Sequence, residues 1–300
     1  MEGLVKLSFY CFTAAAIALA SSAVCYVAYA IGRVRLRQAV MQTSAGTTFS
    51  TSSAEFGPGA VGIGRYGTLL AWFGVVFSGL SVGLRSIVAG RLPLSNMYEY
   101  SLTFIFVLTA IYLAFERFYG VKQLGAIVLP ITVGMAIYVW SLPAWMRDVD
   151  DLIPALQYNL MMTAHVSSAI LAYACFAVAF AAAVLYLIAS KRRIAWLPSP
   201  AMLDDIGFRA VTVGFPLMAM VLILGSVWAY RAWGTYWQWD PKETSALFMW
   251  LVYGVYLHTR GLRGWRGTRS AWVLIFGFAA TVFTYYGNYF FGGLHAYGGV

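Results

Sequence analysis

Eight long apolar runs constrain this sequence more than any other feature. A helix needs about 20 mostly apolar residues to cross a bilayer. The chain is also 61% hydrophobic and only 10% charged, whereas soluble domains carry about 25% charged residues. The sequence therefore predicts an all-α, polytopic integral membrane protein with about eight transmembrane helices. The predicted spans are Leu4–Ile31, Gly67–Leu84, Met97–Phe115, Leu124–Trp140, Thr163–Ala189, Val211–Ala229, Pro241–Leu257 and Ala271–Phe290.

A stretch rich in Ser, Thr, Gly and Ala follows the first span. This stretch, Gln38–Gly62, carries almost no charge, which is typical of a flexible connector. We therefore expect two parts. Residues 1–66 hold an N-terminal transmembrane helix and a flexible cytoplasmic connector, and residues 67–300 form a transmembrane core. All three cysteines lie inside apolar runs without a CxxC pair, so no disulfide framework or thiol redox centre is expected.

The basic residues divide unequally between the two sides of the predicted bundle. One set of alternating loops holds 14 of the 20 Lys and Arg residues, and the opposite side holds the other 6. Loops rich in Lys and Arg stay on the cytoplasmic side of a membrane. The sequence therefore predicts that both termini face the outer side, periplasmic or lumenal. These loops account for the net charge of +9, and we expect no nucleic-acid partner.

The outer loop between the sixth and seventh spans concentrates aromatic residues. Trp233, Trp237 and Trp239 fall within seven residues of one another, and the sequence Asp-Pro-Lys-Glu follows. Asp240 is placed as the N-cap of the next helix, with Glu243 as the returning residue of a capping box. Scattered tryptophans are common at membrane interfaces. Three in one short loop predict an aromatic platform for a flat, apolar ligand.

The chain contains only three histidines. His165 begins the fifth span and His295 follows the eighth, so both map to the outer side with the tryptophan loop. Two imidazoles beside an aromatic platform can hold a planar metal macrocycle through both axial positions. His258 lies about 27 Å along the seventh span, in the inner leaflet, where an ionisable side chain indicates function. Each histidine alone also has a structural interpretation, as a helix–helix hydrogen-bonding residue or an exposed tail residue.

The tryptophan loop belongs to a longer motif that resembles a known family. Trp-Gly-x-x-Trp-x-Trp-Asp-Pro-Lys-Glu-Thr, residues 233–244, is similar to the signature of the WWD haem-handling membrane proteins. Within that group the chain most resembles the CcsA, or ResC, family of system II cytochrome c biogenesis. The resemblance covers about Arg91 to His295 and includes Pro93–Glu99, Trp250–Arg260 and Gly292–His295. The chain departs from the family pattern at Tyr230-Arg-Ala232, where Asn-Glu-Ala is usual, and at Ser245, where an aromatic residue is common.

The resemblance implies a role in cytochrome c biogenesis. Such a protein binds haem b as a transported substrate, passes it across the membrane, and presents it on the outer face. There the haem is attached through thioether bonds to the CxxCH motif of apocytochrome c. By the resemblance, His165 and His295 match the outer axial iron ligands, and His258 matches the ligand of an intramembrane stage. The implied haem platform is the WWD segment, residues 228–243, with Trp233, Gly234, Trp237, Trp239 and Asp240 in contact with haem.

The resemblance also implies partners, namely a CcsB/ResB-like membrane protein and apocytochrome c. The chain would be the haem-binding subunit of a cytochrome c synthase, with no catalytic residue of its own, because the substrate thiols are the nucleophiles. We expect it in a bacterial inner membrane, or alternatively in a thylakoid membrane. Two other functions stay open: a CcmC-like haem chaperone or exporter component, and an unrelated secondary transporter. The absence of an inverted repeat and of paired carboxylates in the spans disfavours the transporter.

Overall fold

The computed structural model describes residues 2–44, 58–149, 159–191, 197–262, 265–287 and 291–295. In these ranges the chain forms helices and no strand, which confirms the all-α prediction. Each predicted span lies in one α-helix, with three exceptions: Leu124 belongs to the short helix η1, Gly287 follows the end of α8, and residues 288–290 fall outside the described ranges. The helices are α1 (Glu2–Ser44), α2 (Pro58–Ala89), α3 (Met97–Tyr119), η1 (Lys122–Leu124), α4 (Gly125–Ser141), η2 (Ala144–Arg147), α5 (Asn159–Lys191), α6 (Pro200–Trp233), α7 (Pro241–Leu262) and α8 (Thr268–Tyr286).

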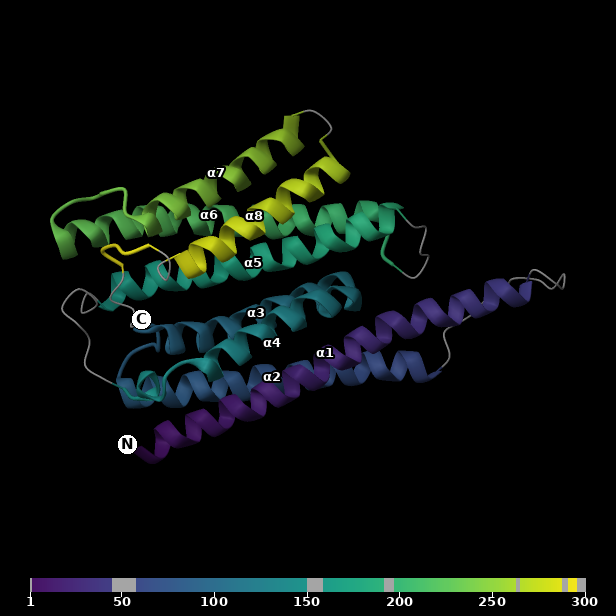
Figure 1. Ribbon diagram of the computed structural model, residues 1–300, viewed down its shortest axis with the longest axis horizontal. Helices are drawn as coiled ribbons and strands as arrows, with labels where there is room; N and C mark the ends of the chain where they lie inside the picture. The colour runs from purple at the N-terminus through teal and green to yellow at the C-terminus, as the bar shows by residue number, and fades with distance from the viewer. Residues whose placement is uncertain are drawn as a thin grey trace.

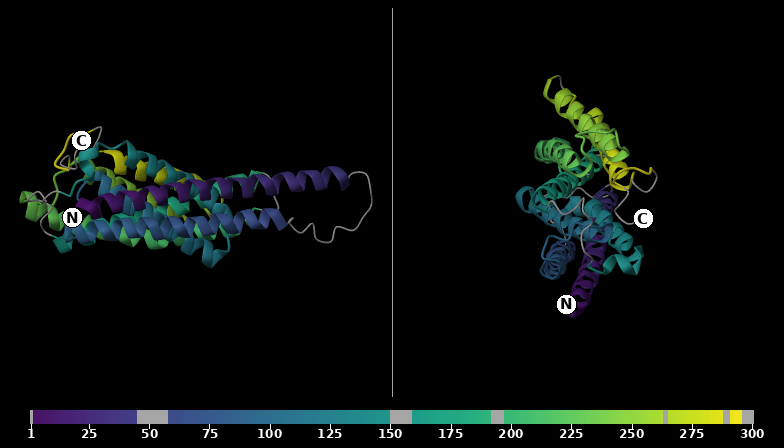
Figure 2. Two further views of the ribbon diagram at one scale, coloured as in Figure 1. Left: turned by 90° about the horizontal axis from the view of Figure 1, so that it is seen from below. Right: turned by 90° about the vertical axis from the view of Figure 1, so that its left-hand side faces the viewer.

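The α-helices run side by side as an antiparallel bundle (Figure 1). The start of α1, the α6–α7 connection and the segment 291–295 lie at the same end of the bundle, here called the outer end (Figures 1 and 2). Among the described residues, six helices, α1 to α6, are long and apolar enough to cross a membrane. Charged residues lie close to an end of both α7 and α8. The crossing of α7 and α8, and the compartment that the outer end faces, stay predictions.

Helix α5 lies in the middle of the bundle and contacts α3, α6 and α8. The alanines between residues 172 and 183 of α5 are buried, and small residues let membrane helices approach closely. Phe176 of α5 stacks on Tyr253 of α7 with ring centroids 3.7 Å apart. Gly214 of α6 leaves room for Phe176, since a Cβ at that glycine would lie 2.7 Å from the ring. Helix α5 thus sets the spacing of the helices that carry the site.

Helices α1 and α2 extend further than the predicted spans, past the other helices at the inner end (Figure 2). The expected flexible connector, Gln38–Gly62, is helical at residues 38–44 and 58–62, so the prediction is wrong there. Residues 45–57 lie outside the described ranges. Gln, Ala and Met, all good helix formers, continue α1, and Pro58 opens α2 where its missing N–H is tolerated. The expected boundary between residues 66 and 67 falls inside α2.

A buried ion cluster fixes the outer ends of α2 and α3. Asn96 caps α3, because its side chain accepts a hydrogen bond from the Glu99 N–H at 2.9 Å. The Glu99 carboxylate is buried and pairs with Arg85 and Arg91, each at 3.0 Å. It also accepts from the backbone N–H and the hydroxyl of Ser95. Buried carboxylates require such partners, so the cluster holds the segment before α3 firmly at the outer end of the bundle.

Candidate functional site

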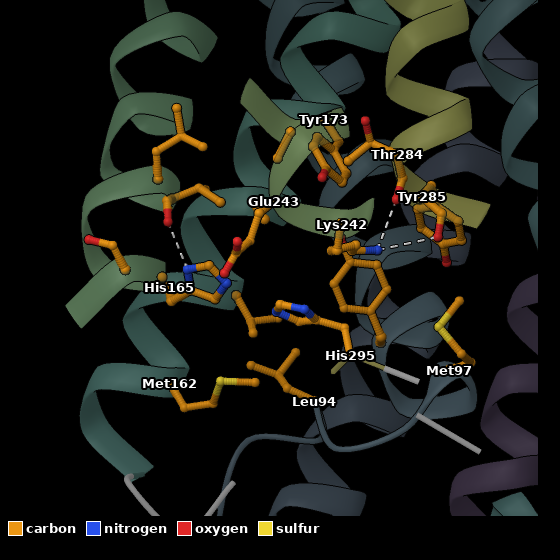
Figure 3. A pocket seen from close by; sticks show the side chains of 18 of the residues that line it. Leu94, Met97, Met162, His165, Tyr173, Lys242, Glu243, Thr284, Tyr285 and His295 are labelled. Carbon is orange, nitrogen blue, oxygen red and sulfur yellow. Dashed lines mark hydrogen bonds between the residues drawn. The ribbon is translucent and has the colours of Figure 1, made fainter. Parts of the chain in front are cut away.

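A cavity of about 170 Å³ opens at the outer end among α3, α5, α6, α7 and α8 (Figure 3). His165 of α5 and His295, which follows α8, both line this outer-end pocket. Apolar and aromatic walls with a few polar groups are typical of small-molecule sites. The remaining wall residues include Leu94, Met97, Tyr100, Met162, Val166, Tyr173, Val221, Gly225, Trp237, Lys242, Glu243 and Tyr285. The two histidines that the sequence placed on the outer side therefore share one pocket.

Helix α6 fixes the imidazole of His165. The Nδ1 atom lies 3.0 Å from the carbonyl oxygen of Val221. A carbonyl can only accept, so Nδ1 donates the hydrogen and Nε2 keeps its lone pair. Gly225, one turn further along α6, leaves space for the ring, because a Cβ there would lie 2.8 Å from Cε1 of His165. The imidazole is thus held in the tautomer whose metal-binding nitrogen is Nε2.

Asp240 fixes the imidazole of His295. Nδ1 of His295 lies 2.9 Å from Oδ1 of Asp240, and the Leu294 N–H donates to Oδ2 at 2.7 Å. Burial disfavours the charged carboxylate, but hydrogen bonds from His295, Lys242 and Leu294 outweigh it and lower the pKa of Asp240 to about 2. Asp240 is therefore an anion at neutral pH and accepts the hydrogen of Nδ1. The contact with Asp240 thus occupies Nδ1, and in a neutral ring Nε2 is the nitrogen that can bind a metal, as in His165.

The N-terminal cap predicted for α7 is confirmed. Oδ1 of Asp240 accepts the Lys242 N–H at 2.9 Å. Oε2 of Glu243 accepts in return from the N–H groups of Asp240 and Gln238, at 3.2 and 2.9 Å. One carboxylate of Asp240 therefore serves both the cap and His295. Capping alone, which explains this residue fully at the level of sequence, is only part of its role.

The residues of the expected platform take different positions. Trp233 meets the His295 ring edge-on at 5.0 Å, and Trp228 lies 4.7 Å from Trp233. Trp237 lines the pocket, whereas Trp239 is 69% exposed and meets Trp237 edge-on at 5.7 Å. Trp233 thus supports an imidazole and Trp237 faces the pocket.

Gly234 ends α6 and starts the turn into the tryptophan loop. Its φ of 80° lies in the left-handed region, and its N–H bonds the carbonyl of Tyr230 at 2.9 Å. A glycine is favoured in this helix-ending conformation because it has no Cβ. Gly234 is not among the residues that line the pocket. In the described structure it ends α6 and allows the chain to turn into the tryptophan loop.

His258 does not join the other two histidines. It lies on an exposed stripe of α7 with Phe248, Leu251 and Val255, each about half exposed. The four positions are three or four residues apart, so they share one face of the helix. The three predicted iron ligands therefore separate into a pair at the outer end and a single residue on an apolar surface.

Sequence reasoning did not identify Val221, Gly225 or Lys242 as part of the site. The first two depend on how α6 is rotated against α5, which periodicity does not fix. Lys242 did carry a signal. A cation in the first turn of a helix is unfavourable next to the positive end of the helix dipole. The presence of Lys242 there therefore indicates a role other than stabilising α7. Its Nζ donates to the carbonyls of Thr284 and Tyr285, at 2.9 and 3.5 Å, where α8 ends.

Comparisons with known proteins agree with this architecture. One solved structure, that of the cytochrome c haem lyase CcmF, matches with a TM-score of 0.65 and 16% identity. The match covers 94% of this chain and 46% of the CcmF chain. At this identity the likeness shows the fold alone.

Several curated relatives have a higher sequence identity to this chain than CcmF has. The cytochrome c biogenesis protein CcsA of Guillardia theta is 37% identical over 79% of this chain and 85% of its own length. CcsA of Synechococcus elongatus is 34% identical over 72% of this chain and 82% of its own length. CcsA of Chlamydomonas reinhardtii is 37% identical, and the match spans 62% of that protein. The family model described as cytochrome c assembly protein matches residues 94–295. The chain therefore belongs to the cytochrome c assembly protein family, as a CcsA-type member.

Proposed function

We propose that this chain acts in cytochrome c biogenesis by binding haem in the outer-end pocket and presenting it there for attachment to apocytochrome c. The pairing of His165 and His295 in one pocket is the observation that supports this most. Each ring is anchored through Nδ1, His165 by the Val221 carbonyl and His295 by the Asp240 carboxylate. In a neutral ring anchored in this way, Nε2 is the nitrogen that can bind a metal. Two such imidazoles can occupy both axial positions of haem iron and leave none for oxygen.

The proposed reaction joins two cysteine thiols of a CxxCH motif to the two vinyl groups of haem b. In each addition the S–H bond adds across the C=C bond, with sulfur on one carbon and hydrogen on the other. The addition needs no external oxidant or reductant. This chain contributes position: two imidazoles hold the iron while Trp237 bounds the ring. A protein that holds a reactant in the reactive geometry lowers the entropic part of the activation barrier.

We propose an earlier haem stage at His258, where a CcsB/ResB-like partner covers this face of α7. His258 is exposed among Phe248, Leu251 and Val255, and an ionisable group is costly against lipid. A partner that packs on this stripe would remove that contact and could supply the second axial ligand. In this proposal the membrane is a bacterial inner membrane, or its thylakoid equivalent, with the outer end towards the periplasm or lumen.

The test is an absorption spectrum of the protein purified with its CcsB-like partner. We expect a low-spin ferrous haem spectrum in the wild type. The variants His165→Ala and His295→Ala should each lose haem or become high-spin, and added imidazole should restore the low-spin bands. His258→Ala serves as the comparison, because it should lower the amount of haem without changing the spin state of what reaches the outer site. Unchanged spectra in both outer variants would rule out the axial assignment.

A further inference from the structure

A single lysine projects among the groups around the two imidazoles. Figure 3 shows Lys242 beside His295, with its ammonium group directed to the end of α8. In the described part of the chain, its hydrogen bonds go to the backbone carbonyls of Thr284 and Tyr285. An ammonium group has three donors, so these carbonyls leave one donor for a ligand.

The carboxylates closest in sequence to Lys242 are already engaged. Asp240 accepts from His295, Leu294 and the Lys242 backbone N–H. One oxygen of Glu243 accepts from two backbone N–H groups. The Lys242 ammonium makes its bonds to neutral carbonyls, although the negative end of the α8 dipole does favour a cation there. The pocket therefore offers a positive charge that no side chain of the described residues neutralises through an ion pair.

We propose that Lys242 binds a carboxylate of the ligand, namely one propionate of haem. This inference rests on the proposed function and adds a recognition residue to it. A carboxylate buried in such a site needs a cationic partner to offset its desolvation, and a charge-assisted hydrogen bond to an ammonium supplies it. The imidazoles recognise iron, whereas Lys242 recognises the edge of the macrocycle, so together they fix both its plane and its rotation.

The rotation matters for the chemistry. In Figure 3 Lys242, Thr284 and Tyr173 lie on one side of the imidazoles, and Leu94 and Met162 lie on the other. Leu94 precedes α3 and Met162 lies in the first turn of α5, so these two segments bound the second side. The two vinyl groups of haem are on the two pyrrole rings that carry no propionate, in the other half of the macrocycle. A propionate held at Lys242 therefore turns the vinyl half of the macrocycle towards Leu94 and Met162, and in this proposal the CxxCH peptide approaches from that side.

The experiment compares haem with haem dimethyl ester, whose propionates are uncharged. The wild-type protein and Lys242→Met, each with the CcsB-like partner, are stripped of haem and titrated with each porphyrin, and binding is followed by the Soret band. Wild type should prefer haem by about ten-fold or more, since a hydrogen bond to a charged group contributes that much. In Lys242→Met the preference should fall close to one. Lys242→Arg keeps the charge and should keep most of the preference.

Two controls separate recognition from folding. Lys6→Met removes another cation at the outer end, one that pairs with Glu2 and is exposed, and should leave the preference intact. The low-spin bands of Lys242→Met with bound ester report whether the imidazole pair is still assembled. A wild-type preference that persists unchanged in Lys242→Met overturns the inference, and so does a wild type that binds both porphyrins equally. Both results leave the proposed function standing, whereas a wild type that binds neither porphyrin rejects the function and the inference together.

Discussion

The carboxylate of Asp240 and the Nδ1 atom of His295 lie 2.9 Å apart, although 55 residues separate them in the chain. The same carboxylate caps α7 and bonds the backbone beside His295. Gly293 permits this approach, because a Cβ there would overlap Oδ2 of Asp240. One side chain thus couples the start of a helix to the orientation of a proposed iron ligand, and this coupling can be tested.

Asp240→Asn should separate the two roles. Asparagine is a good N-cap, so α7 should still form. Its amide has one acceptor oxygen where Asp240 has two. Either the His295 Nδ1 or the Leu294 N–H therefore faces the NH₂ group of the asparagine and loses its acceptor. An unsatisfied buried donor costs about 1–3 kcal/mol, which predicts about a ten-fold loss of haem retention. The measurement is the haem-to-protein ratio after dilution. Ser199→Asn, which changes the cap of α6, is the control and should retain haem; equal loss in both variants would contradict the coupling.

Gly225→Ala should displace His165. The added Cβ would lie 2.8 Å from Cε1 of the ring, and the imidazole is the group that can move. We expect a folded protein whose spectrum matches that of His165→Ala and recovers with added imidazole. Gly134→Ala in α4 is the matched control, because a Cβ there meets nothing within 4 Å. A Gly225→Ala protein with the wild-type spectrum would show that the ring has room to shift without losing the iron.

Trp237→Leu and Trp239→Leu should differ. Trp237 lines the pocket, while Trp239 is 69% exposed. Truncating a wall of the pocket removes aromatic contact with the haem plane, so Trp237→Leu should release haem faster than wild type. Trp239→Leu should release it at the wild-type rate. The measurement is transfer of haem to excess apomyoglobin, followed over time. Similar rates for the two variants would mean that the loop acts as one platform.

Glu99→Gln should destabilise the outer end of the bundle. Glu99 pairs with Arg85 and Arg91 inside the protein, and breaking a buried pair costs about 3–5 kcal/mol. Thermal unfolding in detergent should show a clear drop in the midpoint. Glu2→Gln removes the partner of Lys6, an exposed pair of the kind that contributes little, and its midpoint should stay at the wild-type value. Two equal midpoints would mean that the cluster is dispensable.

Long apolar runs were enough to predict the helices, because each span must satisfy its backbone internally whatever its neighbours are. Counting the spans was enough to predict that His165 and His295 lie at the same end of the bundle. The length of α1 did not follow, since a helix can continue past its apolar run when good helix formers extend it. The connector prediction was wrong at residues 38–44 and 58–62 because low charge and small residues were interpreted as features of a loop.

The finer structure of the site depends on contacts between distant segments. Helix rotation decides that Gly225 faces His165, and no local pattern encodes it. The Asp240–His295 bond joins segments on either side of α7 and α8, so the capping motif alone could not reveal it. The tryptophans looked equivalent in sequence because spacing cannot tell a pocket wall from a ring that supports an imidazole. Their roles separate only when the loop conformation is known.

The position of His295 after α8, bonded to a carboxylate that precedes α7, has a consequence for biosynthesis. A growing chain that has inserted as far as α6 presents His165 but lacks the second imidazole and its anchor. The outer-end pocket is complete only after α7 has packed against α6 and α8 has packed against α5. If His165 and His295 are the axial ligands that we propose, a chain that ends before α8 lacks one of them, so an incomplete translation product would not sequester haem at this site.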